Sequence, residues 1–251
     1  MSCAYLFDGS WEGLLTAVFE SFSTKRWPEA VLPEVDAQLA FDQEAVFVSS
    51  DPVKARRVER GVVRRLGSAA HQKIWTAFLS GDPEKHTIIY RYICAGLEQG
   101  RSIYCALAHR DVLAIDKLCL QTTHEAQKLH GFIRLSRMDN GVFYSRISPN
   151  NNVLPLLMPF FADRYSDQPM LIFDSVHNLA GVYNLTEWYL VETDHIALPG
   201  FAEEEIPCRR LWKQFYHSIA IAQRCNPKCR RSNMPKRYWN NMTEFSFVEK
   251  S

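Results

Sequence analysis

The sequence predicts an α+β protein with a helical block, a small antiparallel sheet with a packed helix, and a long C-terminal helix with a basic tail. Three observations support this prediction. Apolar residues recur at helical spacing through residues 51–130. After Gly131 the apolar runs shorten to strand length on either side of Asn140-Gly141, a strong hairpin signal. Residues 203–245 begin as an amphipathic helix and end in a stretch rich in Lys, Arg and aromatic residues.

Composition favours a folded, soluble chain. Hydrophobic residues make up 47% and aromatic residues 12% of the 251 residues, which is enough for a core and argues against global disorder. No run of about 18 apolar residues is present, so we expect no membrane association. The N-terminus lacks the basic and apolar regions of a signal peptide. We therefore expect a cytoplasmic protein, with a single domain over residues 1–251.

Residues 1–50 are predicted to form a strand, a helix and a second strand. The apolar run Cys3–Phe7 precedes Asp8-Gly9-Ser10, and Ser10 can cap the helix that follows. The second strand is expected at Ala45–Val48, after a loop. The glycine turn at a helix N-terminus is an alternative phosphate site. Because its acidic residue would repel phosphate, a turn and cap is the favoured interpretation.

Residues 51–130 are expected to be mainly helical. Ser50-Asp51-Pro52 supplies a cap and a first-turn proline for the first of these helices. Its polar side is strongly basic, with Lys54, Arg56, Arg57, Arg60, Arg64 and Arg65. This second basic surface is either a binding surface or a solvated helix face. The last helix of the block is expected to run from His109 to His130.

The sheet is predicted from residues 131–193. Strands on either side of Asp139-Asn140-Gly141 should form a hairpin in which Arg137 faces Tyr144. A helix is expected over Leu154–Tyr165. Further strands are expected at Pro169–Phe173, Gly181–Tyr183 and Trp188–Glu192. Because the connections are short, we expect an antiparallel sheet with the helix packed on one face.

Charge is segregated into the C-terminal region. From Ile206 to Thr243 there are nine Lys or Arg and no Asp or Glu, although the net charge of the whole chain is +1. The helix that begins at Glu203-Glu204-Glu205 should end or kink at Asn226-Pro227. A basic stretch with interleaved aromatic rings can bind a polyanion and stack on bases. The alternative is a basic helix end that complements its own macrodipole.

The candidate nucleic-acid contacts come from this stretch. They are Arg224, Lys228, Arg230, Arg231, Lys236, Arg237, Tyr238 and Trp239. The cations would meet phosphates. Tyr238 and Trp239 would stack on exposed bases or pack the tail onto the domain.

No strong catalytic motif is present. The candidate catalytic residues are Asp174, His177 and Glu125. Asp174 follows an apolar strand and lies close to His177 in sequence, an arrangement suited to acid–base chemistry. For each single carboxylate, however, a cap, turn or ion-pair role is the favoured interpretation. Cys225 and Cys229 form a single C-x3-C pair with no second pair nearby. We therefore expect no metal and no cofactor in this chain.

Four stretches together resemble a known bacterial family. They are Tyr5 to Phe19 (YLFDGSWEGLLTAVF), Gly131 to Ile147 (GFIRLSRMDNGVFYSRI), Leu154 to Tyr165 (LPLLMPFFADRY) and Met234 to Phe245 (MPKRYWNNMTEF). The family is a domain of unknown function of about this length, described as probable DNA metabolism or DNA repair proteins. Its pattern does not require Cys225 or Cys229. It has a basic residue after Phe173-Asp174, where this sequence has Ser175-Val176-His177.

The resemblance implies a role directed at DNA. Members of the family are genomic partners of a radical S-adenosylmethionine (radical SAM) protein, itself a DNA modification or repair factor, and some are fused to a uracil-DNA glycosylase-like domain. Any iron–sulfur cluster or S-adenosylmethionine would therefore belong to the partner. Three functions follow: a DNA-binding accessory protein, an enzyme of DNA repair or base modification, and a protein–protein scaffold for the radical SAM partner.

Overall fold

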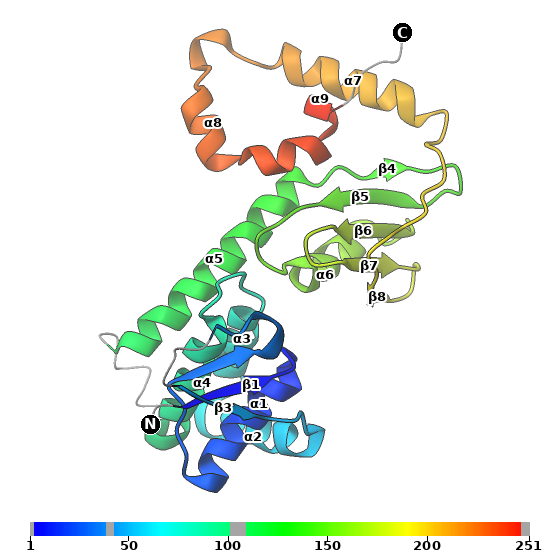
Figure 1. The fold of residues 1–251 in the computed structure, drawn as a ribbon. Helices are drawn as coiled ribbons and strands as arrows, with labels where there is room; N and C mark the ends of the chain where they lie inside the picture. Colours follow the sequence, from blue (N-terminus) through cyan, green and yellow to red (C-terminus); the bar gives the residue numbers. More distant parts are fainter. Residues whose placement is uncertain (1–2, 39–42, 101–108, 247–251) are drawn as a thin grey trace. The chain divides into compact units, whose positions relative to one another are not determined.

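The computed structural model describes residues 3–38, 43–100 and 109–246 (Figure 1). The chain divides into two compact units, Met1–Thr122 and Thr123–Ser251, and the division falls within helix α5 (Arg110–Phe132). Helices and two sheets confirm the predicted α+β class. That one domain spans residues 1–251 stays a prediction, and the units are described separately below.

The first unit contains a three-stranded parallel sheet. Strand β1 (Cys3–Phe7) lies between β2 (Ala30–Pro33) and β3 (Glu44–Phe47). Helix α1 (Trp11–Thr24) provides the crossover that a parallel β1–β2 pair needs. Every residue of β1 is buried, as expected for the central strand of a covered parallel sheet. The sequence prediction missed β2 because it is a short edge strand that ends in a proline.

Four helices of this region confirm the predicted helical block. They are α2 (Pro52–Leu66), α3 (Ser68–Phe78), α4 (Lys85–Gln99) and α5; a short 3-10 turn, η1 (Glu34–Asp36), precedes them. Helix α2 begins as predicted, since the Asp51 carboxylate accepts hydrogen bonds from the amides of Val53 and Lys54 at 2.8 and 3.2 Å. Its apolar residues at helical spacing are buried in the first core. Residues 101–108 of the predicted block lie outside the described residues.

Helices α1 and α2 begin beside the ends of β1 and β3. The Ser10 hydroxyl accepts a hydrogen bond from the Gly13 amide at 2.9 Å, which confirms the predicted cap. The Asp8 carboxylate accepts hydrogen bonds from the hydroxyls of Ser10 and Ser50, both at 2.6 Å. A Cβ atom on Gly13 would lie 2.4 Å from an Asp8 oxygen, so this close approach requires glycine. The turn therefore joins two helix starts.

The second unit contains a five-stranded sheet in the order β4-β5-β6-β7-β8. Its strands are β4 (Ser136–Arg137), β5 (Phe143–Ile147), β6 (Met170–Asp174), β7 (Leu179–Tyr183) and β8 (Trp188–Glu192). The prediction of an antiparallel sheet is correct for three of the neighbouring pairs but wrong for β5 and β6, which are parallel. Helix α6 (Leu154–Arg164) connects these two strands and provides the crossover. It packs on β7, where a Cβ atom on Gly181 would lie 2.3 Å from the Met158 sulfur.

The β4–β5 hairpin has a different register from the predicted one. Helix α5 extends to Phe132, so the strand before the turn is short. Arg137 pairs with Phe143, and the Met138 amide donates to the Val142 carbonyl at 2.9 Å. The loop therefore has three residues ending in Gly141, whose φ is +82°. A three-residue loop that ends in a left-handed glycine is a common hairpin connection.

The two edges of this sheet differ. On the β4 side, the Ala202 amide donates to the Arg137 carbonyl at 3.1 Å, and the Asp139 amide donates to the Gly200 carbonyl at 2.9 Å. Residues 200–202 therefore cover that edge. Strand β8 is the last strand of the sheet on the other side, and all five of its residues are exposed.

The C-terminal region is a set of short helices. They are α7 (Glu205–Ser218), η3 (Ala222–Arg224), α8 (Pro227–Asn233), η4 (Lys236–Asn241) and α9 (Thr243–Ser246). The chain turns back after α8, so that α9 lies beside α7 (Figure 1). The last long helix ends at Ser218, before the predicted break. Asn226-Pro227 starts α8 instead, because the Asn226 side chain accepts a hydrogen bond from the Cys229 amide at 3.0 Å and Pro227 occupies the first turn.

Candidate nucleic-acid interface

Four cations of the C-terminal region are exposed and unpaired. Arg224, Lys228, Arg231 and Lys236 make no ion pair within the residues that the structure describes. They lie on η3, α8 and the start of η4. We call these four residues the C-terminal cation set. Exposed cations without acidic neighbours are suited to bind a polyanion.

A surface groove lies between the end of α7 and the start of α8. Its volume is about 700 Å³, and it is open to solvent. Its lining includes Tyr216, Ile219, Ile221, Arg224, Pro227 and Arg230. The lining is therefore largely apolar, and Arg224 is the member of the cation set that lines it. Phe215, on the preceding turn of α7, is 47% exposed, and its ring centroid lies 5.7 Å from that of Trp212.

Glu125 anchors this region to the core of its unit. This residue of α5 is buried and accepts hydrogen bonds from five donor groups. The Asn151 amide and side chain lie at 2.8 and 2.6 Å from Oε2, and the Asn150 amide at 3.1 Å. Arg237 Nη2 and the Tyr238 hydroxyl lie at 2.7 and 2.5 Å from Oε1. The tail residues therefore bind a carboxylate more than 100 positions earlier in the chain.

The charge of Glu125 is stabilised where it lies. Burial raises the pKa of its carboxyl group, but the hydrogen bonds from Tyr238, from the two asparagine amides and from Arg237 outweigh burial and hold the pKa below its usual range. Burial and the neighbouring carboxylate raise the pKa of Tyr238, so its hydroxyl stays a donor. With both oxygens already accepting hydrogen bonds, Glu125 acts as an anchor and has no oxygen free to take a proton from a substrate.

Tyr238 and Arg237 make contacts within the second unit. The Tyr238 side chain is 3% exposed and belongs to the second core, so its ring has no free face for a base. Arg237 donates to Glu125 and to the Tyr238 hydroxyl, and lies over the Tyr238 ring at 4.7 Å. Of the two roles considered for Tyr238, the structure supports packing of the tail onto the domain.

Trp239 and Arg230 are also engaged within the tail. The Trp239 ring stacks on Phe245 at 4.8 Å, and its Nε1 donates to the Met234 carbonyl at 3.1 Å. Arg230 lies over the Trp239 ring at 4.9 Å. Both residues thus hold α8 and α9 together, while the cation set faces solvent.

A second buried carboxylate, Glu244, fixes α9 and was not singled out from the sequence. Arg134 donates to it at 2.8 and 3.2 Å, and the indole of Trp212 donates to it at 3.1 Å. Burial raises the pKa of Glu244, but the hydrogen bonds from Arg134 and Trp212 help to lower it below the usual range. Asn150 and Asn151 were likewise missed, and the only local signal for them is the polar turn before Leu154.

The structure brings Asp174 and His177 together at the end of β6. Asp174 is fully buried and accepts hydrogen bonds from the Val176 and His177 amides at 2.9 and 3.2 Å. Its other oxygen lies 2.6 Å from Nδ1 of His177, and because a carboxylate only accepts, this nitrogen carries the proton. The remaining imidazole nitrogen, Nε2, is then left as a base or acceptor on a partly exposed side chain.

Hydroxyl and amide groups lie beside this pair. The hydroxyls of Ser148 and Ser175 lie 3.2 Å apart, and the Asn241 side chain donates to Ser148 at 3.2 Å. Strands β5 and β6 are parallel, so their carboxyl ends meet at one edge, and the tail contributes Asn241 there. This arrangement can position a proton acceptor next to hydrogen-bonding groups.

Within the described ranges, no three His, Cys, Asp or Glu side chains are grouped so that they could hold a metal ion. Cys225 and Cys229 are exposed free thiols. Among the same residues, no helix combines the length and apolar character needed to cross a bilayer. The absence of a metal or cofactor therefore stays a prediction.

Comparison with known proteins gives a family without an assigned activity. The sequence matches the family described as "Domain of unknown function (DUF4130)" over residues 83–244, more than half of its length, and the chain belongs to this family. It is also 35% identical over 77 residues to the coenzyme PQQ synthesis protein F of Klebsiella pneumoniae. That match covers 31% of this chain and 10% of that protein, so the chain spans about a tenth of this relative's length. No solved structure matches.

Proposed function

We propose that this member of the DUF4130 family is a cytoplasmic DNA-binding accessory protein of DNA metabolism or repair that works with a radical SAM partner. The observation that carries the proposal is the C-terminal cation set, which is exposed and forms no ion pair with a described residue. The resemblance to the DNA repair family supplies the partner. The anchoring of the tail by Glu125 supports the proposal, because cations on a fixed surface lose less conformational entropy on binding than cations on a free tail.

The proposed DNA contacts are the exposed cations that form no ion pair with a described residue, together with one exposed aromatic ring. Arg224, Lys228, Arg231 and Lys236 would bind phosphates, and Phe215 would stack on a base. Tyr238 and Arg237 would support this surface through Glu125 without touching DNA. The apolar residues that line the adjoining groove suit an unpaired base better than a continuous duplex, so we expect tighter binding to single strands.

The test is DNA affinity as a function of salt concentration, measured by fluorescence anisotropy with labelled single-stranded and duplex oligonucleotides. We expect the variant with Arg224, Lys228, Arg231 and Lys236 all replaced by Gln to lose at least about tenfold in affinity at low salt. Its plot of log affinity against log salt should also be flatter, because each phosphate contact contributes about −0.7 to the slope on single strands and about −0.9 on duplex DNA.

A charge-matched control replaces four exposed cations of α5 and α6 by Gln. These are Arg110, Lys117, Lys128 and Arg164. The control should bind as the wild type does. A flat salt response of the wild type, or equal loss in both variants, would contradict the proposed contact surface.

A second candidate function, an enzyme of DNA repair or base modification, is favoured by one observation. The buried Asp174 carboxylate holds the His177 ring in the tautomer that leaves Nε2 as a base. This function predicts turnover of damaged oligonucleotides by the chain together with its radical SAM partner. His177→Gln should abolish the turnover without lowering DNA affinity. A wild-type chain that binds these oligonucleotides and leaves them intact would exclude it.

A further inference from the structure

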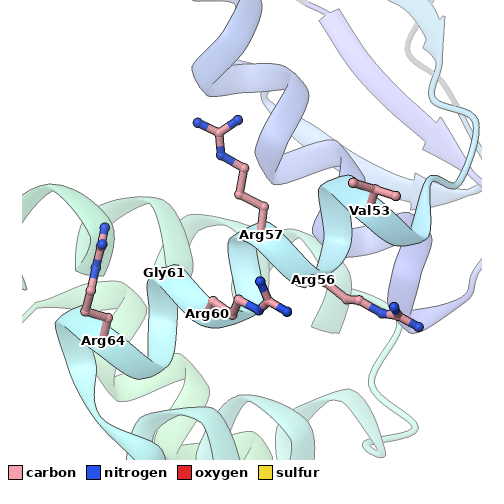
Figure 2. A pocket seen from close by; sticks show the side chains of 6 residues that line it. All are labelled: Val53, Arg56, Arg57, Arg60, Gly61 and Arg64. Atoms are coloured by element: carbon pink, nitrogen blue, oxygen red, sulfur yellow. The ribbon is translucent and has the colours of Figure 1, made fainter.

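Helix α2 carries a second unpaired basic surface. Arg56, Arg57, Arg60 and Arg64 line an open groove of about 680 Å³ together with Val53 and Gly61 (Figure 2). Figure 2 shows the four guanidinium groups spread along the helix and projecting from it. None of the four forms an ion pair with another described residue. We call Arg56, Arg57, Arg60 and Arg64 the arginine stripe.

The other charges of α2 have internal partners. Lys54 binds Glu20 at 2.6 Å, and Arg65 donates to the Leu97 carbonyl. Glu59, the one acidic residue within α2, lies 2.7 Å from His71 of α3. Lys54, Arg65 and Glu59 thus make contacts within the protein, whereas the arginine stripe forms no ion pair with a described residue.

The stripe opposes the stability of the free helix. Arg56 and Arg60 are four residues apart, as are Arg60 and Arg64, and like charges at this spacing repel one another on a helix surface. Arg57 has one compensating contact, over the Phe19 ring at 5.5 Å. A bound anion would relieve this repulsion.

Gly61 gives an independent indication that a ligand approaches α2. It lies in the helix interior, where only Pro is less favourable than Gly. Packing against the described residues does not require it, because among them a Cβ atom at this position would meet only a Leu97 methyl carbon at an ordinary 3.6 Å. Its position in the lining of the groove means that a ligand can come close to the helix backbone there.

We propose that the arginine stripe binds the phosphate backbone of a nucleic acid, as a contact surface separate from the C-terminal cation set. The inference rests on the proposed DNA-binding function and extends it to a helix outside the region matched by the family. Guanidinium groups bind phosphates through two parallel hydrogen bonds. Along the helix axis, Arg56, Arg60 and Arg64 are spaced by about 6 Å, so the stripe presents a line of charge about 12 Å long.

The lining also argues for backbone recognition over other ligands. The described part of the groove has no amide or aromatic side chain to read a base, and Val53 is its one apolar side chain. The described lining offers the apolar side chains of an acidic peptide a single apolar contact, Val53. A membrane surface would require an apolar face, but the apolar residues of α2, Ala55, Val58, Val62 and Leu66, are buried in the core.

The experiment measures the affinity of the full chain for random-sequence duplex and single-stranded oligonucleotides against salt. The test variant is Arg56→Gln, Arg60→Gln and Arg64→Gln, which spares Arg57 because of its contact with Phe19. We expect at least about a tenfold loss of affinity and a flatter salt slope, with the melting temperature equal to or above that of the wild type. Unchanged affinity would overturn the proposal, as would equal loss in a control with Arg110, Lys117 and Lys128 replaced by Gln.

Further measurements distinguish DNA binding by the arginine stripe from membrane binding and from DNA binding by the C-terminal cation set. Gly61→Ala should raise the melting temperature and weaken DNA binding, and if the triple variant fails to fold, unchanged affinity of Gly61→Ala overturns the proposal. Binding to phosphatidylserine vesicles in preference to DNA also overturns it. Loss of affinity in the α2 variant with full affinity in the C-terminal quadruple variant would support the stripe and sink the C-terminal surface; the reverse result would do the opposite.

Discussion

Glu125 gathers donors from the loop before α6, from Arg237 and from Tyr238. A buried carboxylate is costly to desolvate, and the cost is met only when its oxygens are fully hydrogen-bonded. The five donor groups do this, and they tie the tail to α5 in the same step. The position of the C-terminal cation set therefore depends on a residue that carries the opposite charge.

At this scale, Tyr238→Phe separates an anchoring role from a DNA-contact role. The change removes the hydroxyl that donates to Glu125 and accepts from Arg237, but keeps the ring. We expect the free energy of unfolding to fall by about 1.5–3 kcal/mol, as for a hydrogen bond to a charged group. DNA affinity of the folded protein should change little. Urea unfolding and anisotropy give the two quantities.

Tyr189→Phe is the matched control, because Tyr189 is exposed on β8. It should change the free energy of unfolding by less than about 0.5 kcal/mol. Equal stability of Tyr238→Phe and the wild type would show that the buried hydroxyl is not an anchor.

The contacts that could not be predicted from the sequence are those between residues far apart along the chain. The basic residues of the tail stand out from composition alone. Tyr238 and Glu125 are 113 positions apart, and no local pattern shows that they meet. Asp174 and His177 are three positions apart, so a strand end followed by a turn was enough to suggest their contact. Local spacing thus revealed the near pair and left the distant one hidden.

Two glycines in helices have opposite effects at the scale of elements. A Cβ atom on Gly13 would meet Asp8, Ser50 and Phe7 within 3 Å, whereas one on Gly61 makes an ordinary contact. Alanine gains up to about 1 kcal/mol of helix propensity at either site. At Gly13 this gain is offset by overpacking, which costs about 1–3 kcal/mol.

We therefore expect Gly13→Ala to destabilise the protein by roughly 1–2 kcal/mol and Gly61→Ala to stabilise it by up to about 1 kcal/mol. Thermal or urea unfolding of the two variants, compared side by side, checks both signs. A Gly13→Ala protein as stable as Gly61→Ala would mean that the junction between β1, α1 and α2 adjusts without cost.

Elements with their own signals were predicted well. Helix α2 has a cap, a first-turn proline and an apolar stripe, and it begins where these place it. Strand β2 has four residues and owes its existence to pairing with β1, so the sequence around it resembled a loop. The antiparallel prediction is wrong for β5 and β6 because α6 and its flanking loops are long enough to carry the chain across to a parallel partner.

Helix α7 shows that an apolar helix pattern in the sequence does not guarantee burial. Its apolar spacing is that of a helix packed on a core, yet Leu211, Phe215 and Ile219 are exposed. Periodicity reports that a face is apolar and says nothing of what covers it. A tertiary contact also fixes the middle of α7, where the Trp212 indole donates to the buried Glu244 of α9.

At the scale of the whole molecule, charge is uneven although the net charge is only +1. The C-terminal cation set and the arginine stripe lie in different compact units, and acidic residues elsewhere balance them. Association with a polyanion is then governed by local surfaces and not by the net charge. This is why the charge-matched control variants are decisive: they alter the net charge equally and leave both surfaces intact.

The second sheet has one edge, strand β8, to which a further strand could be added. Residues 200–202 occupy the backbone groups along β4, while β8 ends the sheet with the sequence Trp-Tyr-Leu-Val-Glu, which contains no proline or lysine. Natural sheets usually protect such a border with those residues. An incoming extended chain would therefore be templated at β8 and not at β4. Within this second sheet, the β8 edge is therefore where pairing with another copy of the chain would begin.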